Sequence, residues 1–149
     1  MRNSSISQIK ILAIKLSLNL KNGDFLLLHG DIGTGKTTLT RYIINNIQKK
    51  YKKRQTEIPS PTFNIALEYN IKNFVVRHFD LYRIKKKFEI NNIGLFEEMD
   101  NAITIVEWPE LIKKKPKNYI KISFKYSKKI NERNLRISSH GRCKEYEIN

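Results

Sequence analysis

The stretch GDIGTGKT, residues 30–37, stands between two segments of opposite character. Before it, FLLLH (25–29) is a short apolar run without alternation, as expected of a strand that is covered on both faces in a parallel sheet. After it, apolar residues recur at helical spacing up to about residue 50: Leu39, Ile43 and Ile47. This order of strand, glycine-rich loop and helix predicts a parallel α/β core.

The loop itself fits the phosphate-binding pattern of Gly, four residues, Gly, Lys, then Ser or Thr. Its glycines allow positive φ angles and a close approach of the backbone to a phosphate, and the first amides of the following helix point at the anion. Lys36 would supply positive charge to the β and γ phosphates, and Thr37 a hydroxyl to Mg²⁺. The flanking strand and helix are the context that the pattern requires, so the sequence predicts a nucleoside triphosphate site.

Other segments add strands and helices around this core. Residues 6–20 carry apolar side chains at spacings of three and four and predict an amphipathic helix. Residues 63–69 alternate apolar and polar side chains, and with 74–80 they predict an antiparallel hairpin. The uncharged run AITIV (102–106) predicts a second buried strand.

The C-terminal third is expected to extend the sheet. We expect 84–100 to be helical in pieces broken near Gly94, and the strands 119–126 and 134–138 to pair with each other. The prediction is an α/β, P-loop NTPase-like three-layer fold, with a parallel core sheet and antiparallel strands at its edges. It forms a single domain over 1–149, with residues 140–149 as a flexible tail.

The net charge and the cysteine content restrict the possible functions less than the phosphate-binding pattern does. The formal net charge of +15 over 149 residues is typical of a surface for RNA, DNA or an acidic partner, but a lysine-rich coding bias explains it equally well. Cys143 is the only cysteine, which excludes an internal disulfide and fits a reducing compartment. No run approaches the roughly 20 apolar residues of a membrane span, so we expect a cytoplasmic protein without membrane contact.

Two acids compete for the position beside the magnesium ion. Glu107 follows five uncharged residues, so its strand can lie inside the parallel sheet next to 25–29. Asp80 ends a run that contains Arg77 and arrives by a hairpin, which suggests a more peripheral strand. The pattern therefore favours Glu107 as the metal-side acid. Asp80 fits a helix cap or an ion pair with Arg83 as well as it fits a catalytic role.

Three ring side chains near these acids have no decided role from the pattern. His29 and His78 are read as structural residues, because a lone histidine at a strand end is more often satisfied in the fold than catalytic. Trp108 is compatible with the core, with the wall of a nucleotide pocket, or with a partner surface.

An ordered set of motifs resembles the TsaE (YjeE) family of bacterial P-loop ATPases, which take part in making threonylcarbamoyladenosine (t6A) in tRNA. The motifs are GDIGTGKTTLTR, SPTF, HFDLYR, GLFEEM and IVEWPE, and the resemblance runs from about residue 5 to 138. Thr34 stands where the family commonly has alanine, and the basic stretch before SPTF lacks the usual glycine. We expect the backbone-mediated loop to tolerate the first difference, whereas the second leaves the shape of that connection undetermined.

The resemblance implies a cytoplasmic ATPase that is weak alone and works with the paralogous pair TsaB and TsaD. It implies ATP and Mg²⁺ as ligands, and contact with tRNA only through the complex. The implied roles are a metal site at Thr37 and Glu107, an acid for hydrolysis at Asp80, and a nucleotide contact from Arg133. The phosphates would be held by Gly33, Thr34, Gly35, Lys36, Thr37 and Thr38, and a switch-like or partner region would comprise Ser60, Pro61, Thr62, Phe63 and Trp108.

Two other classes of function remain as alternatives. A small-molecule or nucleotide P-loop kinase shares the loop and the size, but it usually has an arginine-bearing lid, and no arginine cluster of that sort is evident. A basic RNA-binding module rests on the net charge alone, and its binding would weaken steeply with salt. ATP in preference to GTP comes from the resemblance, because no base-reading motif is visible.

Overall fold

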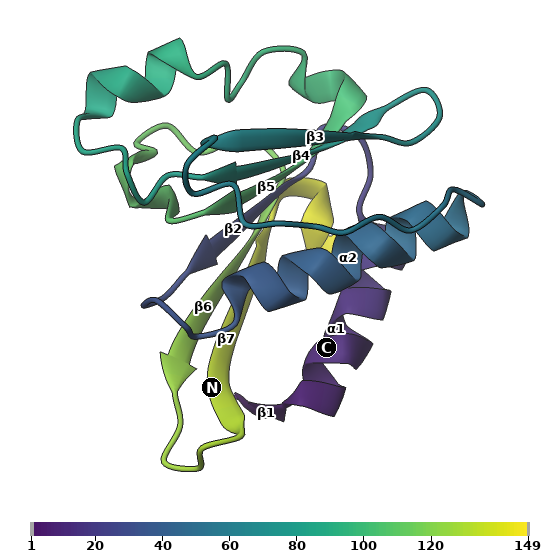
Figure 1. Cartoon of the computed structure of the whole chain (residues 1–149), viewed down its shortest axis with the longest axis vertical. Helices are drawn as coiled ribbons and strands as arrows, with labels where there is room; N and C mark the ends of the chain where they lie inside the picture. Colours follow the sequence, from purple (N-terminus) through teal and green to yellow (C-terminus); the bar gives the residue numbers. More distant parts are fainter. Residues whose placement is uncertain (1, 149) are drawn as a thin grey trace.

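One mixed sheet contains all the strands of the computed structural model, which describes residues 2–148 (Figure 1). The strand order is β1-β7-β6-β2-β5-β4-β3. The strands are β1 (Arg2–Ser5), β2 (Phe25–His29), β3 (Ala66–Asn70), β4 (Val75–Asp80), β5 (Ala102–Glu107), β6 (Tyr119–Tyr126) and β7 (Glu132–His140). The helices are α1 (Ile6–Asn19) and α2 (Lys36–Lys50), with short 3-10 helices at Lys87–Asn92, Met99–Asn101, Pro109–Leu111 and Gly141–Glu145.

The centre of the sheet is parallel and its margins are antiparallel. β2 pairs parallel with both β5 and β6, and β4 pairs parallel with β5. β3, β7 and β1 add antiparallel to this core. The uncharged runs of β2 and β5 are buried as expected, because both strands lie inside the sheet and have both faces covered. The predicted fold class is therefore confirmed.

Different structures cover the two faces of the sheet. The helices α1 and α2 lie side by side on one face, over a core that includes Leu26, Leu28 and Ile105 (Figure 1). The other face, with Phe25, Leu27 and Val106, is covered by the irregular connections after β4 and β5, which contain the first three of these 3-10 helices. A capping box between Ser5 and Gln8 begins α1. Among residues 2–148, no helix has both the length and the apolar character needed to cross a membrane.

β4 is more peripheral than β5, as expected, because it lies between β5 and the edge strand β3. It nevertheless has a neighbouring strand on each side. Polar residues in β4 are compatible with this inner position because they are buried with partners: Arg77 is 8% exposed and Asp80 is 3% exposed. β3 also begins at Ala66 rather than at Phe63, because Ile65 takes a φ of 66° and its N–H bonds to the Pro61 carbonyl in a turn.

The two ends of the described chain also pack more tightly than expected. β1 escaped prediction because its residues RNSS have no apolar alternation; it is held by pairing with β7. Residues 141–148, expected to form a flexible tail, fold back onto the helical face. Cys143 and Ile148 are buried there, and Arg142 and Tyr146 both bond to the buried carboxylate of Asp24.

Candidate nucleotide-binding site

The candidate site lies at one edge of the sheet, where the parallel strands β2, β4 and β5 end. The phosphate-binding loop follows β2, while Asp80 and Glu107 are the last residues of β4 and β5. Glu107 pairs in register with Leu28 on one side and with Asp80 on the other. This is the usual location of a ligand site in an open α/β sheet.

The loop provides a backbone cradle for an anion. Gly35 has a φ of 107°, a conformation that favours glycine, and it is the N-terminal cap residue of α2. No side chain caps this helix end, so the N–H groups of its first turn remain available to a phosphate. At Gly30, with a φ of 141°, a Cβ atom would lie 2.7 Å from the Phe124 carbonyl oxygen. The loop therefore depends on glycine both for its turn and for its packing against β6.

The Lys36 side chain folds back onto the start of the loop. Its Nζ donates hydrogen bonds to the carbonyls of Gly30, at 2.5 Å, and Asp31, at 2.8 Å, and lies 4.2 Å from the centroid of the Trp108 ring. Burial lowers the pKa of Lys36 from its ordinary value, and the charges of Glu107 and Asp80 oppose that shift. The side chain is thus directed into the loop by its own carbonyls and an aromatic face.

The predicted metal ligands are in contact with each other. Thr37 Oγ1 donates to Glu107 Oε2 at 2.9 Å, and Glu107 is 2% exposed. A hydroxyl and a carboxylate are oxygen ligands of the kind that Mg²⁺ prefers. Within residues 2–148, no group of three or more His, Cys, Asp and Glu side chains could hold a metal alone. The pair fits Mg²⁺ because this ion is usually bound through one or two protein ligands together with phosphate oxygens and water.

His78 is the main functional candidate that the pattern missed. Its ring is buried, and Nε2 lies 2.8 Å from Glu107 Oε1. An ionised carboxylate only accepts hydrogen bonds, so Nε2 carries the proton and donates. His78 therefore orients the acid that contacts Thr37. The sequence did contain one indication of this role. His78 stands two residues before Asp80, and side chains at that spacing lie on the same face of a strand, so this spacing alone would place His78 near the same acids.

Asp80 connects the end of β4 to the SPTF segment. Asp80 Oδ2 accepts a hydrogen bond from Thr62 Oγ1 at 2.6 Å, and Thr62 Oγ1 is 2.9 Å from Ser60 Oγ. Asp80 Oδ1 accepts from the Tyr82 N–H at 2.9 Å and so stabilises the turn after the strand. The alternative of an ion pair with Arg83 does not hold, because the Arg83 guanidinium lies over the Phe63 ring instead.

Aromatic side chains line the approach to the loop. Trp108 follows Glu107 with a φ of 58°, and its ring lies 4.9 Å from that of Tyr82. Phe63 is 81% exposed, whereas Pro61 beside it is buried. Trp108 thus faces Lys36 at the site, and Phe63 presents an apolar surface beside Thr62, which bonds to Asp80.

Arg133 reaches the loop only indirectly. Its guanidinium lies 5.1 Å from the centroid of the Tyr126 ring and donates to the carbonyls of Ile130 and Glu132. The Tyr126 hydroxyl in turn donates to the carbonyl of Ile32 in the phosphate loop. The nucleotide contact of Arg133 stays a prediction, and the structure adds a link from Arg133 to the loop through Tyr126 that the pattern had not indicated.

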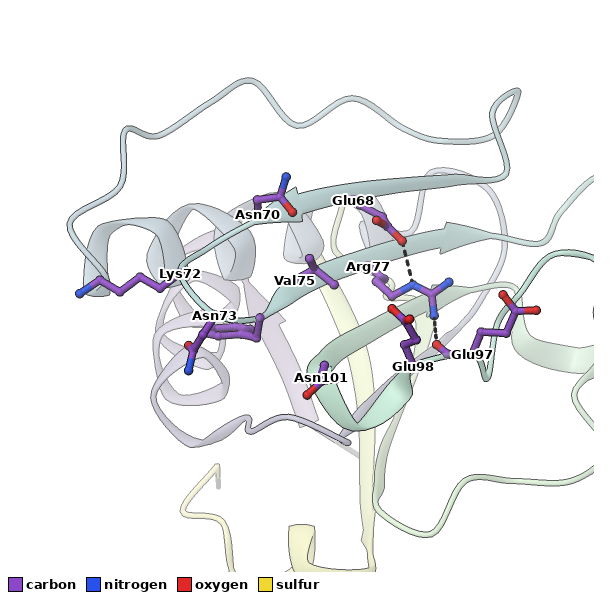
Figure 2. A pocket seen from close by; sticks show the side chains of 10 residues that line it. Glu68, Asn70, Lys72, Asn73, Val75, Arg77, Glu97, Glu98 and Asn101 are labelled. Atoms are coloured by element: carbon purple, nitrogen blue, oxygen red, sulfur yellow. Dashed lines mark hydrogen bonds and ion pairs between the residues drawn. The ribbon is translucent and has the colours of Figure 1, made fainter.

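A large hollow on the surface lies elsewhere. Its volume is about 570 Å³, and it is bordered by the first residue of β4, Val75, and by the connection that precedes β5. Figure 2 shows the Arg77 side chain between Glu68 and Glu97 in this hollow, with an Arg77 Nε to Glu68 Oε1 distance of 3.2 Å. Because it lies at the starts of the strands whose ends carry Asp80 and Glu107, it is separate from the candidate site.

Comparison with known proteins gives one family. The family model described as "Threonylcarbamoyl adenosine biosynthesis protein TsaE" matches residues 3–135. The tRNA threonylcarbamoyladenosine biosynthesis protein TsaE of Rickettsia conorii is 41% identical over 110 residues, which are 74% of this chain and 61% of the relative. The TsaE proteins of Rickettsia felis and Haemophilus influenzae are 42% identical over 106 residues and 35% identical over 102, covering 71% and 68% of this chain and 60% and 61% of the relatives. The match thus spans about three fifths of the length of these three proteins.

A solved structure resembles the whole fold. The crystal structure of YdiB from Bacillus subtilis superposes with a TM-score of 0.72 at 28% sequence identity. The similarity covers 99% of this chain and 88% of that one. The fold therefore occurs in an experimentally determined protein.

Proposed function

This chain belongs to the TsaE family, and from that premise we propose that it binds ATP with Mg²⁺ and hydrolyses it to support threonylcarbamoylation of adenosine in tRNA. The observation that carries the proposal is the hydrogen bond from Thr37 to the buried Glu107 at the uncapped start of α2. It joins a phosphate cradle to a metal-side acid, which are the two parts that phosphoryl chemistry on a P-loop requires.

The site residues have separable roles in this proposal. The loop amides from Gly33 to Thr38 and the Lys36 ammonium bind the phosphates, and Thr37 and Glu107 hold Mg²⁺. The bound ion would supply positive charge that stabilises the phosphate oxygens during hydrolysis. His78 keeps the carboxylate of Glu107 turned toward Thr37.

Asp80 has a different task in the proposal. It holds Thr62 and thereby the segment Ser60–Phe63 against the end of β4. From there it orients the attacking water or couples this segment to the γ-phosphate. Its buried position supports the assignment, since its partners keep the carboxylate in one orientation.

We further propose that the chain acts in the cytoplasm with TsaB and TsaD, and that tRNA modification itself takes place on that complex. The exposed ring of Phe63 next to the site suits a partner contact that could influence hydrolysis. Trp108 is placed to take part, because it lies between Lys36 and Tyr82.

Phosphate release from ATP, measured with and without a TsaB–TsaD complex, tests this function. We expect weak activity alone and higher activity with the partners. The change Lys36→Ala should lower hydrolysis by about 100-fold, because it removes a charge aimed at the phosphates. The exposed Lys53→Ala serves as the matched control and should retain the activity.

Two outcomes would contradict the proposal. One is unchanged t6A formation in cells that carry only the Lys36→Ala protein. The other is transfer of the γ-phosphoryl group to an acceptor other than water, which would indicate a kinase.

A further inference from the structure

One face of the β6–β7 ribbon is uncovered. Along β6, Ile120, Ile122 and Phe124 point into the core under the helices, so the alternate residues Lys121, Ser123 and Lys125 point to the other face. On that other face, the second core cluster includes Tyr119 as its single contribution from β6 and β7, among the residues that the structure describes. Figure 1 shows β6 and β7 extending away from the connection that covers β3, β4 and β5.

A hollow on the uncovered face is lined by three cations and three uncharged polar side chains. This shallow hollow of about 190 Å³ is lined by Lys121, Ser123, Lys125, Asn134, Arg136 and Ser138. The cross-strand pairs are Lys121 with Ser138, Ser123 with Arg136, and Lys125 with Asn134, so the six side chains form one patch. We refer to these six residues as the β6–β7 patch.

The cations of the patch lack acidic partners. Lys121, Lys125 and Arg136 are exposed, and none of the ion pairs found within residues 2–148 involves them. The pKa of Lys115 is lowered, first by burial and second by the positive charge of the nearby Lys121. The carboxylate near Lys115 is that of Glu110, which contacts His29. The charges of Lys115 and Lys121 therefore repel each other, and a polyanion on this face would relieve that repulsion.

The spacing of the cations identifies the kind of anion. Arg136 lies opposite Ser123, diagonal to both Lys121 and Lys125, and diagonal neighbours in a sheet are about 7–8 Å apart. Three charges at such intervals along a ribbon of two strands suit a repeated charge, such as a sugar-phosphate backbone, better than a single phosphate. The patch also has no apolar or aromatic side chain, which the centre of a protein interface would normally contain.

We propose that the β6–β7 patch binds the sugar-phosphate backbone of RNA, and that it gives this chain a direct contact with tRNA. The choice of RNA over other polyanions rests on the proposed role in tRNA modification, whereas the patch itself rests on its geometry and charge. Lysine, arginine, serine and asparagine are the side chains that commonly contact phosphates, and they position a nucleic acid without reading its bases.

The test measures binding of an unmodified tRNA transcript to the full chain at several salt concentrations, without nucleotide or partner proteins. The patch variant carries Lys121→Gln, Lys125→Gln and Arg136→Gln. The control carries Lys49→Gln, Lys53→Gln and Arg54→Gln, three exposed cations near the end of α2, so both variants lose two lysines and one arginine. Thermal unfolding of both variants should match that of the unmodified chain and so verify that they are folded.

The patch variant should bind the tRNA at least about tenfold more weakly, and its slope of log affinity against log salt should be shallower by about 2 to 3. The control should change affinity by less than about threefold. Lys36→Ala should bind the tRNA as the unmodified chain does, so a failure of the ATPase proposal is distinguishable from a failure of this one.

Three results would overturn the inference. The first is no tRNA binding by the unmodified chain at physiological salt, and the second is an equal loss in the patch variant and the control, which would assign binding to overall charge. The third is unchanged tRNA binding by the patch variant together with lost association with TsaB–TsaD, which would make the patch a surface for an acidic protein.

Discussion

Asp80 and Glu107 are neighbours in register, but their carboxylates have different partners. Glu107 contacts Thr37 of the phosphate loop and His78, whereas Asp80 contacts Thr62 and the Tyr82 N–H. Because each carboxylate has both of its oxygens engaged, each is held in one orientation. The proposed division between a metal-side acid and an acid that acts on hydrolysis thus rests on the different surroundings of the two carboxylates.

Exchange of each acid for its amide should separate the two roles. We expect Asp80→Asn to retain Mg²⁺-ATP affinity within about threefold while it lowers hydrolysis by at least about tenfold. Glu107→Gln should instead weaken the dependence on Mg²⁺, because it removes a charged oxygen ligand. Nucleotide binding and phosphate release, each titrated with Mg²⁺, measure the two effects. Equal loss of Mg²⁺-ATP binding in both variants would show that this division of labour is wrong.

At the scale of elements, Arg77 of β4 holds the connection between β4 and β5 by hydrogen bonds to its carbonyl groups. Its guanidinium donates to the carbonyls of Gly94 and Glu97, at 2.8 and 2.9 Å, from a position that is 8% exposed. It also contacts Glu68 of β3, whose side chain is 56% exposed (Figure 2). A charged residue in an inner strand is therefore explained by the carbonyl groups of an irregular segment that would otherwise lack donors.

The change Arg77→Met keeps most of the side-chain length but removes all these hydrogen bonds. We expect it to lower the free energy of unfolding by about 1–3 kcal/mol, because the carbonyl groups lose a buried donor. Urea unfolding gives this value, and faster proteolysis within 84–101 should accompany it. Glu68→Gln is the matched control, since an ion pair with an exposed partner contributes less than about 1 kcal/mol. A larger loss in the control than in Arg77→Met would contradict the proposed role.

At the scale of the whole molecule, the C-terminal residues close the fold beside the start of β2. Asp24 is buried and accepts hydrogen bonds from Arg142 and Tyr146 at 2.9 and 2.6 Å. Between these two residues, Cys143 is buried in the helical core. Burial, followed by the charge of Asp24, raises the pKa of the Cys143 thiol from its ordinary 9.0 to about 12. Burial and the bond to Asp24 likewise raise the pKa of Tyr146.

These shifts predict a loss of stability at alkaline pH. The unfolded chain releases the Cys143 proton near pH 9, whereas the folded chain keeps it to about pH 12. Unfolding then releases a proton, so stability falls as pH rises through this window. The midpoint of thermal unfolding should decrease more steeply above pH 9 for the unmodified chain than for Cys143→Ala. Parallel curves for the two proteins between pH 7.5 and 10.5 would exclude this contribution.

The phosphate loop and the buried strands were predictable because their causes are local. A glycine-rich turn between an apolar run and a helical repeat specifies its own conformation, and five uncharged residues before Glu107 are enough to indicate a strand inside the sheet. The ordered motifs likewise indicated the family. Thr37 and Glu107 were paired correctly for this reason, since the loop and the end of a buried neighbouring strand must meet at the same edge.

The order of the strands depends on the tertiary structure, and so do the contacts that hold the residues of the candidate site in place. β4 was expected to be more peripheral than β5, and it lies next to the edge strand, but the partners of its buried Arg77 and His78 come from segments distant in sequence: 94–97 for Arg77 and Glu107 for His78. The contact of Asp80 with Thr62 and the link from Arg133 through Tyr126 to the loop are of the same kind. The sequence alone thus determined which residues form the glycine-rich loop and the buried strands beside it, because backbone preference and burial are encoded over a few neighbouring residues. Only the folded chain decided what holds those residues in place, because hydrogen bonds between distant segments depend on the register and packing of the complete sheet.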